Sequence, residues 1–378
     1  MTIKEDNISG LYVHIPFCTS KCAYCNFYSE PVSAHDTYRL LQAMRRELSL
    51  ADTSAVRTVY IGGGSPSCLP AAQLAEFMKT ITDKCHDITE FTVECNPCQA
   101  APRMLENLRE LGVNRLSIGA QSFNDDELNL LGRIHNSESV RTAVYQARQA
   151  GFENISLDLI FAICGSTQAT WQASLEQAIA LNPEHISAYS LTLEASTPLA
   201  QEIEQGKYTA VDELTDRAMY EQAIETLTKA GYEHYEISNF AKSGFECRHN
   251  MGCWQNRPYI GIGPSASSSS GTRRTRNFSD IKTYIKAIES DQSPIGETVK
   301  ISDMDRICET AVLNLRTKNG IDVKKFKQVT GNDPCLLFAE PVRTHCEQGL
   351  LKIENDRIYL TAKALPIADY VLCDFAAL

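Results

Sequence analysis

Short apolar segments alternate with longer amphipathic segments over the first half of the chain. Six segments rich in β-branched and aromatic residues predict strands, at 10–16, 59–63, 90–95, 114–120, 154–161 and 185–191. The intervening segments predict helices, at 35–50, 70–84, 103–111, 137–150 and 168–181. Met104, Leu108 and Leu111, for example, share one helix face. Because a helix follows each of the first five strands, the pattern predicts an α/β fold, a closed or partial TIM-like β/α barrel with its functional groups at the carboxyl ends of the strands.

The pattern changes after about residue 290. A helix over 303–316 and two shorter helical stretches precede a hairpin over 350–361 that turns at residues 354–356, and a terminal helix runs to Phe375. Helices followed by a hairpin indicate a small α+β, winged-helix-like domain. We therefore expect two domains, at 1–290 and 291–378.

Charge and hydropathy exclude several classes of protein. The net charge of −11 argues against a nucleic-acid surface, and the basic cluster at 273–276 is interpreted as a solvated loop. The serines at 267–270 resemble a short flexible run. Apolar runs fall far short of the ~18 residues of a membrane span, and the polar start, with both charge signs, does not resemble a signal peptide. The expected location is the cytoplasm.

Three of the fourteen cysteines stand close together after the first predicted strand. Cys18, Cys22 and Cys25 supply three thiolates within eight residues, which suits an iron–sulfur cluster with one iron left free. A zinc site completed by the distant Cys68 is the alternative. Three packed structural cysteines fit poorly because Lys21 and its neighbours make the segment polar.

This spacing, directly after Leu-Tyr-Val-His-Ile-Pro-Phe, resembles the radical S-adenosylmethionine (SAM) superfamily. More narrowly, the chain resembles the group that contains oxygen-independent coproporphyrinogen dehydrogenases and HemW-type heme chaperones, from Leu11 to about Phe375. The resemblance implies a radical SAM type of partial barrel and a [4Fe–4S] cluster on Cys18, Cys22 and Cys25. It also implies S-adenosylmethionine on the free iron and an electron donor for the cluster.

Later motifs extend the resemblance to the cofactor site. Residues 62–66 (Gly-Gly-Gly-Ser-Pro) resemble the family's glycine-rich stretch, and Glu94 stands in a Glu-x-Asn-Pro motif. A tight turn is the bland alternative for the glycines, and a surface cation for Arg133. Residues 161–167 depart from the family pattern. The cofactor contacts that the resemblance implies are Tyr12, Tyr24, Gly63, Gly64, Ser65, Glu94, Gln121, Arg133 and Asp158.

Other features choose between the two groups. Phe27 stands where the dehydrogenases carry a fourth cysteine, and residues 248–254 resemble the chaperones' His-Asn-x-x-Tyr-Trp heme motif. This likeness implies His249 as a heme contact supported by Trp254. A loop histidine that satisfies backbone groups is the alternative, and Cys253 replaces the usual tyrosine.

The sequence thus favours a heme chaperone that passes heme to respiratory membrane proteins. An oxygen-independent coproporphyrinogen III dehydrogenase is the enzyme alternative, and a degenerate scaffold is the third. A homodimer and peripheral membrane association through a partner are left open.

Overall fold

A twelve-stranded sheet forms the larger part of the molecule in the computed structural model, which describes residues 9–377. Its centre consists of six parallel neighbours: β1 (Gly10–Ile15), β4 (Thr58–Gly63), β5 (Glu90–Cys95), β6 (Arg115–Gln121), β7 (Ile155–Phe161) and β8 (His185–Ser190). All six predicted strands are confirmed to within a residue or two.

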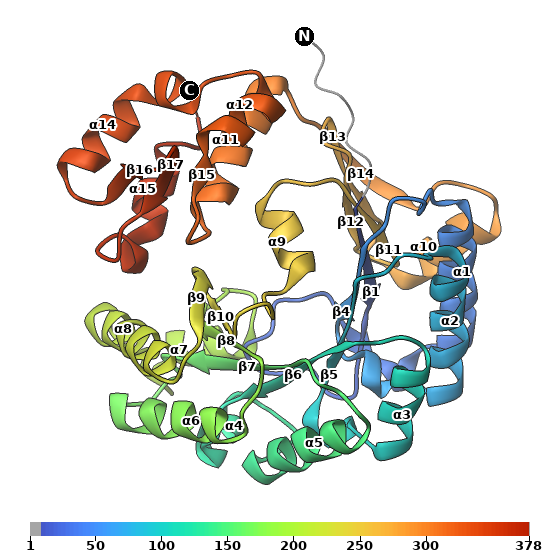
Figure 1. Ribbon diagram of the computed structural model, residues 1–378. Coiled ribbons are helices and arrows are strands. Elements are labelled where there is room, and N and C mark those ends of the chain that lie inside the picture. The colour runs from blue at the N-terminus through green and yellow to red at the C-terminus, as the bar shows by residue number, and fades with distance from the viewer. Residues whose placement is uncertain (1–8, 378) are drawn as a thin grey trace.

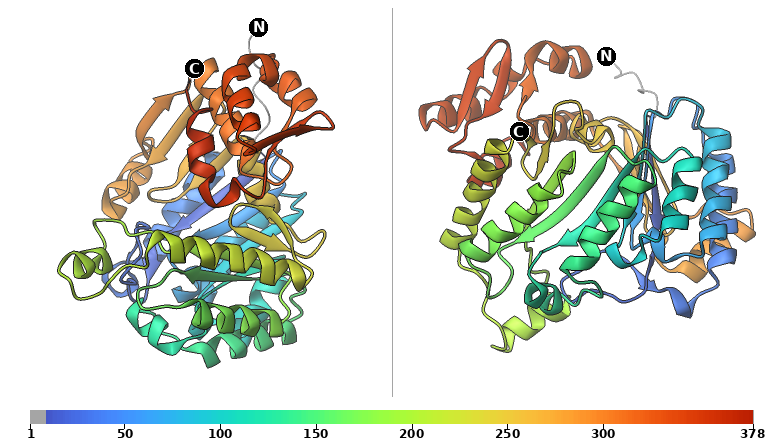
Figure 2. Two further views of the ribbon diagram at one scale, coloured as in Figure 1. Left: turned by 90° about the vertical axis from the view of Figure 1, so that its left-hand side faces the viewer. Right: turned by 60° about the horizontal axis from the view of Figure 1, so that its bottom comes forward.

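Helices cover the outer face of this curved sheet (Figures 1 and 2). The predicted ones are α1 (Thr37–Leu50), α2 (Ala71–Lys84), α3 (Pro102–Glu110), α5 (Ser137–Gln149) and α6 (Gln168–Ala180). They form because their apolar stripes are buried against the strands, as Leu40, Met44 and Leu48 of α1 are. Four further helices of this region were not predicted from the sequence: α4 (Asp125–Leu130), α7 (Pro198–Glu204), α8 (Glu213–Lys229) and α10 (Ile281–Glu289).

Antiparallel strands extend the sheet at both edges and leave the barrel open. β11 (Tyr259–Ile262) lies parallel to β1 and is followed by β12 (Ser267–Ser269), β13 (Arg273–Asn277) and β14 (Ile295–Lys300). β10 (Asn239–Ala241) and β9 (Glu233–Glu236) form the other edge. Of the two predicted barrel forms, the structure shows the partial one.

Two loop predictions in this region are wrong. The serine run forms β12, and the basic cluster forms β13, because each segment completes a main-chain ladder with its neighbour. Arg274 also pairs with Glu309, at 3.1 Å between Nη2 and Oε2.

The C-terminal unit has its own apolar core and a three-stranded antiparallel sheet, as the α+β prediction required. Its elements are α11 (Asp303–Leu315), β15 (Ile321–Asp322), α12 (Val323–Thr330), α13 (Pro334–Leu337), α14 (Ala339–Glu347), β16 (Leu351–Glu354), β17 (Arg357–Leu360) and α15 (Ala368–Cys373). The predicted hairpin turn is present, and Asn355 and Asp356 take left-handed φ angles of 51° and 59° there. The domain division at residue 290 stays a prediction; β14, beyond it, is bonded to β13.

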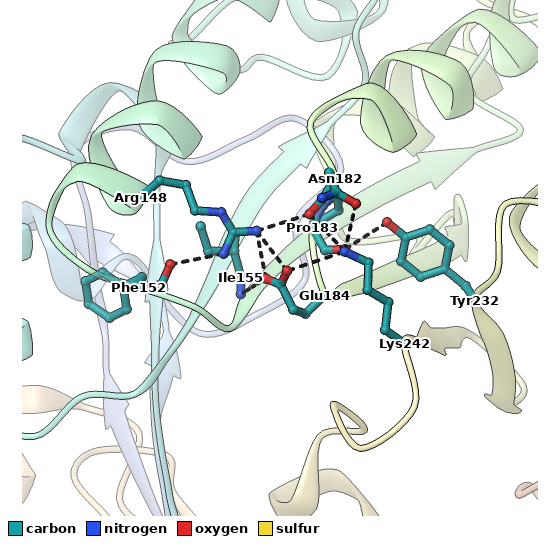
Figure 3. Close-up of polar contacts among 8 residues, drawn as sticks. All are labelled: Arg148, Phe152, Ile155, Asn182, Pro183, Glu184, Tyr232 and Lys242. Atoms are coloured by element: carbon teal, nitrogen blue, oxygen red, sulfur yellow. Dashed lines mark hydrogen bonds and ion pairs between the residues drawn. The ribbon is translucent and has the colours of Figure 1, made fainter.

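Charged side chains stabilise the amino ends of the strands. Glu184, before β8, accepts hydrogen bonds from Arg148 at 2.8 Å and from the Ile155 amide at 3.1 Å, and pairs with Lys242 at 3.4 Å (Figure 3). The short helix α9 (Arg248–Trp254) closes the same end of the barrel near β5, since Glu90 accepts the amides of Arg248 and His249. None of the helices within residues 9–377 is long and apolar enough to cross a membrane.

Candidate cofactor site

A cavity of about 800 Å³ runs from the carboxyl ends of the parallel strands into the barrel. Twelve of the fourteen predicted site residues line it: Tyr12, Cys18, Cys22, Tyr24, Cys25, Gly63, Gly64, Ser65, Glu94, Gln121, Arg133 and Asp158. They come from the neighbouring parallel strands β1, β4, β5, β6 and β7 and from the segments that follow β1, β4 and β6, and the parallel order of the strands brings them to one place.

Strand alternation explains how the wall of the cavity is built. Arg115, Ser117, Gly119 and Gln121 of β6 all line it, two residues apart. Side chains of a strand point alternately to either face, so every second residue of β6 faces the barrel interior.

The three cysteines lie in the segment after β1, which closes over the mouth of the cavity. β2 (Phe17–Cys18) pairs with β3 (Glu30–Pro31), and the Cys25 amide donates to the Cys22 carbonyl at 3.3 Å. Arg133 donates from Nη1 to the Cys22 sulfur at 3.3 Å. Burial raises the pKa of the Cys18 and Cys25 thiols.

This donor set fits an iron–sulfur cluster better than a single ion. Within residues 9–377, no three His, Cys, Asp or Glu side chains are grouped so that they could hold one metal ion. A cluster instead binds each thiolate at a separate iron, so its ligands need not converge on a point. The zinc alternative, which needs four converging ligands, has no such group here.

The glycine-rich stretch packs against the segment that carries the cysteines. The amides of Gly64 and Ser65 donate to the carbonyls of Ile15 and Phe17, at 2.8 Å and 2.7 Å. A Cβ on Gly64 would overlap the Phe17 carbonyl group, and Gly63 has a φ of +106°. The backbone here therefore requires glycine, and it brings its polar groups to the cavity surface.

Two carboxylates face the cavity without a cation in hydrogen-bond contact within the described residues. Glu94 accepts from the Tyr60 hydroxyl at 2.8 Å and from the Gly63 amide at 3.2 Å. Burial, followed by the charge of Asp158, raises the pKa of Glu94 to about 7. Asp158 accepts from the hydroxyls of Ser117 and Ser187 at 2.9 Å and 2.7 Å. The partners that a charged residue in a buried strand requires are therefore hydroxyls.

Two non-glycine residues with strained backbone lie at the carboxyl ends of β6 and β7. Gln121 and Ala162 take φ angles of 64° and 57°, which non-glycine residues rarely adopt. Arg133 fixes this region further by donating from Nη2 to the Gly119 carbonyl at 3.0 Å. Such strain is concentrated where proteins bind ligands.

The two predicted heme contacts do not line the cavity. His249 is only 7% exposed, and a hydrogen bond of 3.1 Å joins its Nδ1 to the Thr58 hydroxyl. Its ring packs 5.4 Å from that of Tyr60, which does line the cavity. Burial and the charge of Arg115 lower the pKa of His249 to about 4. Trp254 stacks under the Arg316 guanidinium at 4.9 Å.

Several lining residues were missed in the sequence. Tyr60, Ser117 and Ser187 supply the hydroxyls that hold the two carboxylates. Arg115 and Asn250 line the deep end. The signal for Ser117 was present, since it precedes Gln121 by an even number of residues in the same strand.

The comparisons with known proteins agree with this geometry. The chain matches the radical SAM superfamily over residues 12–178 and the HemN C-terminal domain over residues 301–367. It is 36% identical over 361 residues to the heme chaperone HemW of Bacillus subtilis (strain 168), covering 94% of this chain and 95% of that protein. It is 34% identical to HemW of Lactococcus lactis, covering 97% of each.

A solved structure shows the same fold. Coproporphyrinogen III oxidase (HemN) from Escherichia coli superposes with a TM-score of 0.85 at 22% identity, covering 99% of this chain and 91% of that one. The resemblance drawn from the cysteine motif is thereby confirmed. With near-complete coverage of its relatives, this chain belongs to the radical SAM superfamily and, within it, to the family of the HemW heme chaperones.

Proposed function

We propose that this protein is a heme chaperone that carries a [4Fe–4S] cluster, binds S-adenosylmethionine and heme, and delivers heme to respiratory membrane proteins. The observation that supports it most is the gathering of three thiols, a glycine-rich backbone and two carboxylates around one cavity. The names of relatives at 36% and 34% identity support the chaperone assignment over the enzyme one.

In this proposal the mouth of the cavity holds the cluster and the adjoining wall holds the cofactor. Cys18, Cys22 and Cys25 ligate three irons, and the cluster supplies a fourth iron open to S-adenosylmethionine. Arg133, whose guanidinium contacts Cys22, is placed to receive the carboxylate of the methionine moiety. Glu94 accepts hydrogen bonds from amino or hydroxyl groups when it is ionised.

The remaining wall positions the cofactor. Gly63, Gly64 and Ser65 offer backbone polar groups, Gln121 offers an amide, and Asp158 offers a carboxylate held by serines. Tyr12 and Tyr24 present aromatic rings to the same space.

We place heme near α9, with His249 as its contact and Trp254 in support. The His249 ring lies one aromatic layer behind the cavity, against Tyr60, and is engaged by Thr58. Ligation of heme iron therefore requires α9 or Tyr60 to move. An electron donor for the cluster and a heme-accepting membrane protein are the expected partners, and the cytoplasm is the expected location.

An anaerobic heme titration of the cluster-reconstituted protein tests the proposal. We expect a saturable shift of the Soret absorbance that weakens in His249→Ala. Thr58→Val is the matched control, because it removes the partner of the His249 ring and keeps the imidazole. Absence of saturable heme binding, together with turnover of coproporphyrinogen III, would instead assign the protein to the dehydrogenases.

A further inference from the structure

One charged side chain inside the cavity has no role in the function proposed above. Arg115 begins β6, is 2% exposed, and lines the deep end of the cavity. Neither a hydrogen bond nor an ion pair joins its guanidinium to another group within residues 9–377, and its Nε is buried without a partner. A buried guanidinium that lacks hydrogen-bond acceptors is strongly unfavourable, so this one points to an absent anion.

Neighbouring carboxylates do not take that place. Cys247 and, after it, the charge of Glu90 raise the pKa of Arg115. The two oxygens of Glu90 nevertheless accept the amides of Arg248 and His249, at 2.8 Å and 2.9 Å, so they are directed at the start of α9. Asp158 and Glu94 are held by hydroxyls and an amide.

The deep end also contains the other groups of a polar subsite. Asn250 lines the cavity together with Arg115. His185 also lines it, but its two ring nitrogens are engaged by the hydroxyls of Ser156 and Tyr235, both at 2.8 Å. Asn250 belongs to α9, so the segment that resembles a heme motif forms part of this floor. A planar guanidinium with free donors fits a carboxylate, which it binds by two parallel hydrogen bonds.

The distance along β6 separates the subsite at Arg115 from the site at the mouth of the cavity. Arg133 contacts Cys22 and the carbonyl of Gly119, near the carboxyl end of β6. Arg115 lies four residues before Gly119, about 13 Å deeper at the rise of a parallel strand. A ligand held at the mouth must therefore extend across most of the barrel to reach Arg115, whereas heme placed near α9 lies at the same end of the barrel as Arg115.

We propose that Arg115 forms a carboxylate-binding subsite at the floor of the barrel, occupied by a propionate of the bound tetrapyrrole. The inference rests on the proposed function, because heme is the tetrapyrrole concerned. The other source of a carboxylate is the methionine moiety of S-adenosylmethionine, and the experiment distinguishes the two.

Anaerobic titrations with heme and with heme dimethyl ester, whose propionates are uncharged, test the subsite in the wild-type protein first. We expect heme to bind about 10- to 100-fold more tightly than the ester, the range that a charge-assisted hydrogen-bond pair gives. Arg115→Gln is expected to lower heme affinity to that of the ester and to leave affinity for S-adenosylmethionine unchanged. Arg148→Gln is the matched control: it removes an arginine from the same end of the barrel but outside the cavity, and it is expected to keep the discrimination.

Each other outcome has a definite meaning. Equal binding of heme and ester by the wild type overturns the inference while the proposed function stands. Loss of S-adenosylmethionine binding in Arg115→Gln, with discrimination retained, reassigns the subsite to the cofactor. Absence of saturable binding of either tetrapyrrole overturns both proposals. If Arg115→Gln does not fold, Arg115→Lys serves instead, and undiminished discrimination there, without the planar fork, counts against the subsite.

Discussion

Glu184, at the amino ends of the parallel strands, and the carboxylates of the cavity are held by different kinds of groups. At the amino ends, Glu184 is held by Arg148 and Lys242, so its charge is neutralised within the protein (Figure 3). Further along the strands, Glu94 near the carboxyl end of β5 and Asp158 midway along β7 take hydrogen bonds from neutral groups and face a cavity. The difference indicates that the charge of Glu184 serves the stability of the fold, whereas the charges of Glu94 and Asp158 are available to a ligand in the cavity.

From this difference we expect mutations in the two regions to change different properties. Changes at the cavity mouth and wall should alter ligand binding with little effect on stability. Changes at the amino ends should alter the free energy of unfolding and leave S-adenosylmethionine binding unchanged. Arg115 is expected to be an exception: it lies at the amino end of β6 but lines the cavity, so its replacement should weaken heme binding.

The largest effect is expected at the cysteines. Replacing Cys18, Cys22 and Cys25 together with alanine should abolish cluster binding, since three irons of the cluster would then lose their thiolate ligands. Iron content and the broad visible absorbance after reconstitution measure it. A control in which Cys335, Cys346 and Cys373 of the C-terminal unit become alanine should keep the cluster. Retention of iron in the first variant contradicts the cluster site.

The next effect concerns stability at the amino ends. Glu184→Ala leaves Arg148, Lys242 and the Ile155 amide without their shared acceptor. We expect it to lower the free energy of unfolding by about 2–3 kcal/mol, the range for hydrogen bonds to charged groups. Chemical denaturation measures the change, and S-adenosylmethionine affinity should stay within twofold of wild type. A large loss of affinity would break the separation between the two ends.

A pH-dependent effect is expected at the cavity wall. The pKa of Glu94 is about 7, so the carboxyl is ionised above and protonated below that pH. Affinity for S-adenosylmethionine should therefore rise between pH 6 and pH 8, and Glu94→Gln should remove this rise and weaken binding about tenfold at pH 8.

The same group has the opposite effect on the unliganded fold. Its pKa in the folded state is raised from 4.5, so the folded protein holds a proton that the unfolded chain releases. The stability that it contributes is present below pH 4.5 and is lost as the pH rises towards 7. Unfolding curves of wild type and Glu94→Gln across this range test the sign; parallel pH profiles would contradict the raised pKa.

The smallest effect is expected at Thr58. Thr58→Val removes one hydrogen bond to the buried His249 ring and should destabilise the protein by about 1 kcal/mol. Thermal unfolding measures it, with Thr80→Val at a partly exposed position of α2 as the control. An increase in heme affinity in Thr58→Val would show that releasing the His249 ring is part of heme binding.

Much of the fold could be predicted from the sequence because long segments with a regular apolar period form strands and helices that local pattern alone identifies. The six parallel strands and the helices between them have apolar patterns that predict a parallel sheet with helices packed on its outer face. The strands at the edges of the sheet could not be predicted in this way. β12 consists of serines and β13 of arginine, threonine and asparagine residues, and their place in the sheet depends on pairing with neighbouring strands rather than on their own composition.

The site divides in the same way. The cysteines and the motif positions around the mouth were found from local spacing. The contacts at the amino ends of the strands could not be found from local spacing. The His249 amide reaches the Glu90 carboxylate only because α9 folds back across the start of β5. Such a contact between residues more than a hundred and fifty positions apart leaves no local pattern.

The contacts between β9 and the C-terminal unit have a practical consequence for the handling of this protein. The Ile237 amide donates to the Arg316 carbonyl at 3.1 Å, and the Lys318 amide donates to the Tyr235 carbonyl at 2.9 Å. These bonds occupy main-chain groups at the rim of the large sheet. Truncation before α11 would uncover that rim, and uncovered strand edges recruit other chains. A barrel expressed alone should therefore aggregate during purification, whatever the state of its cluster.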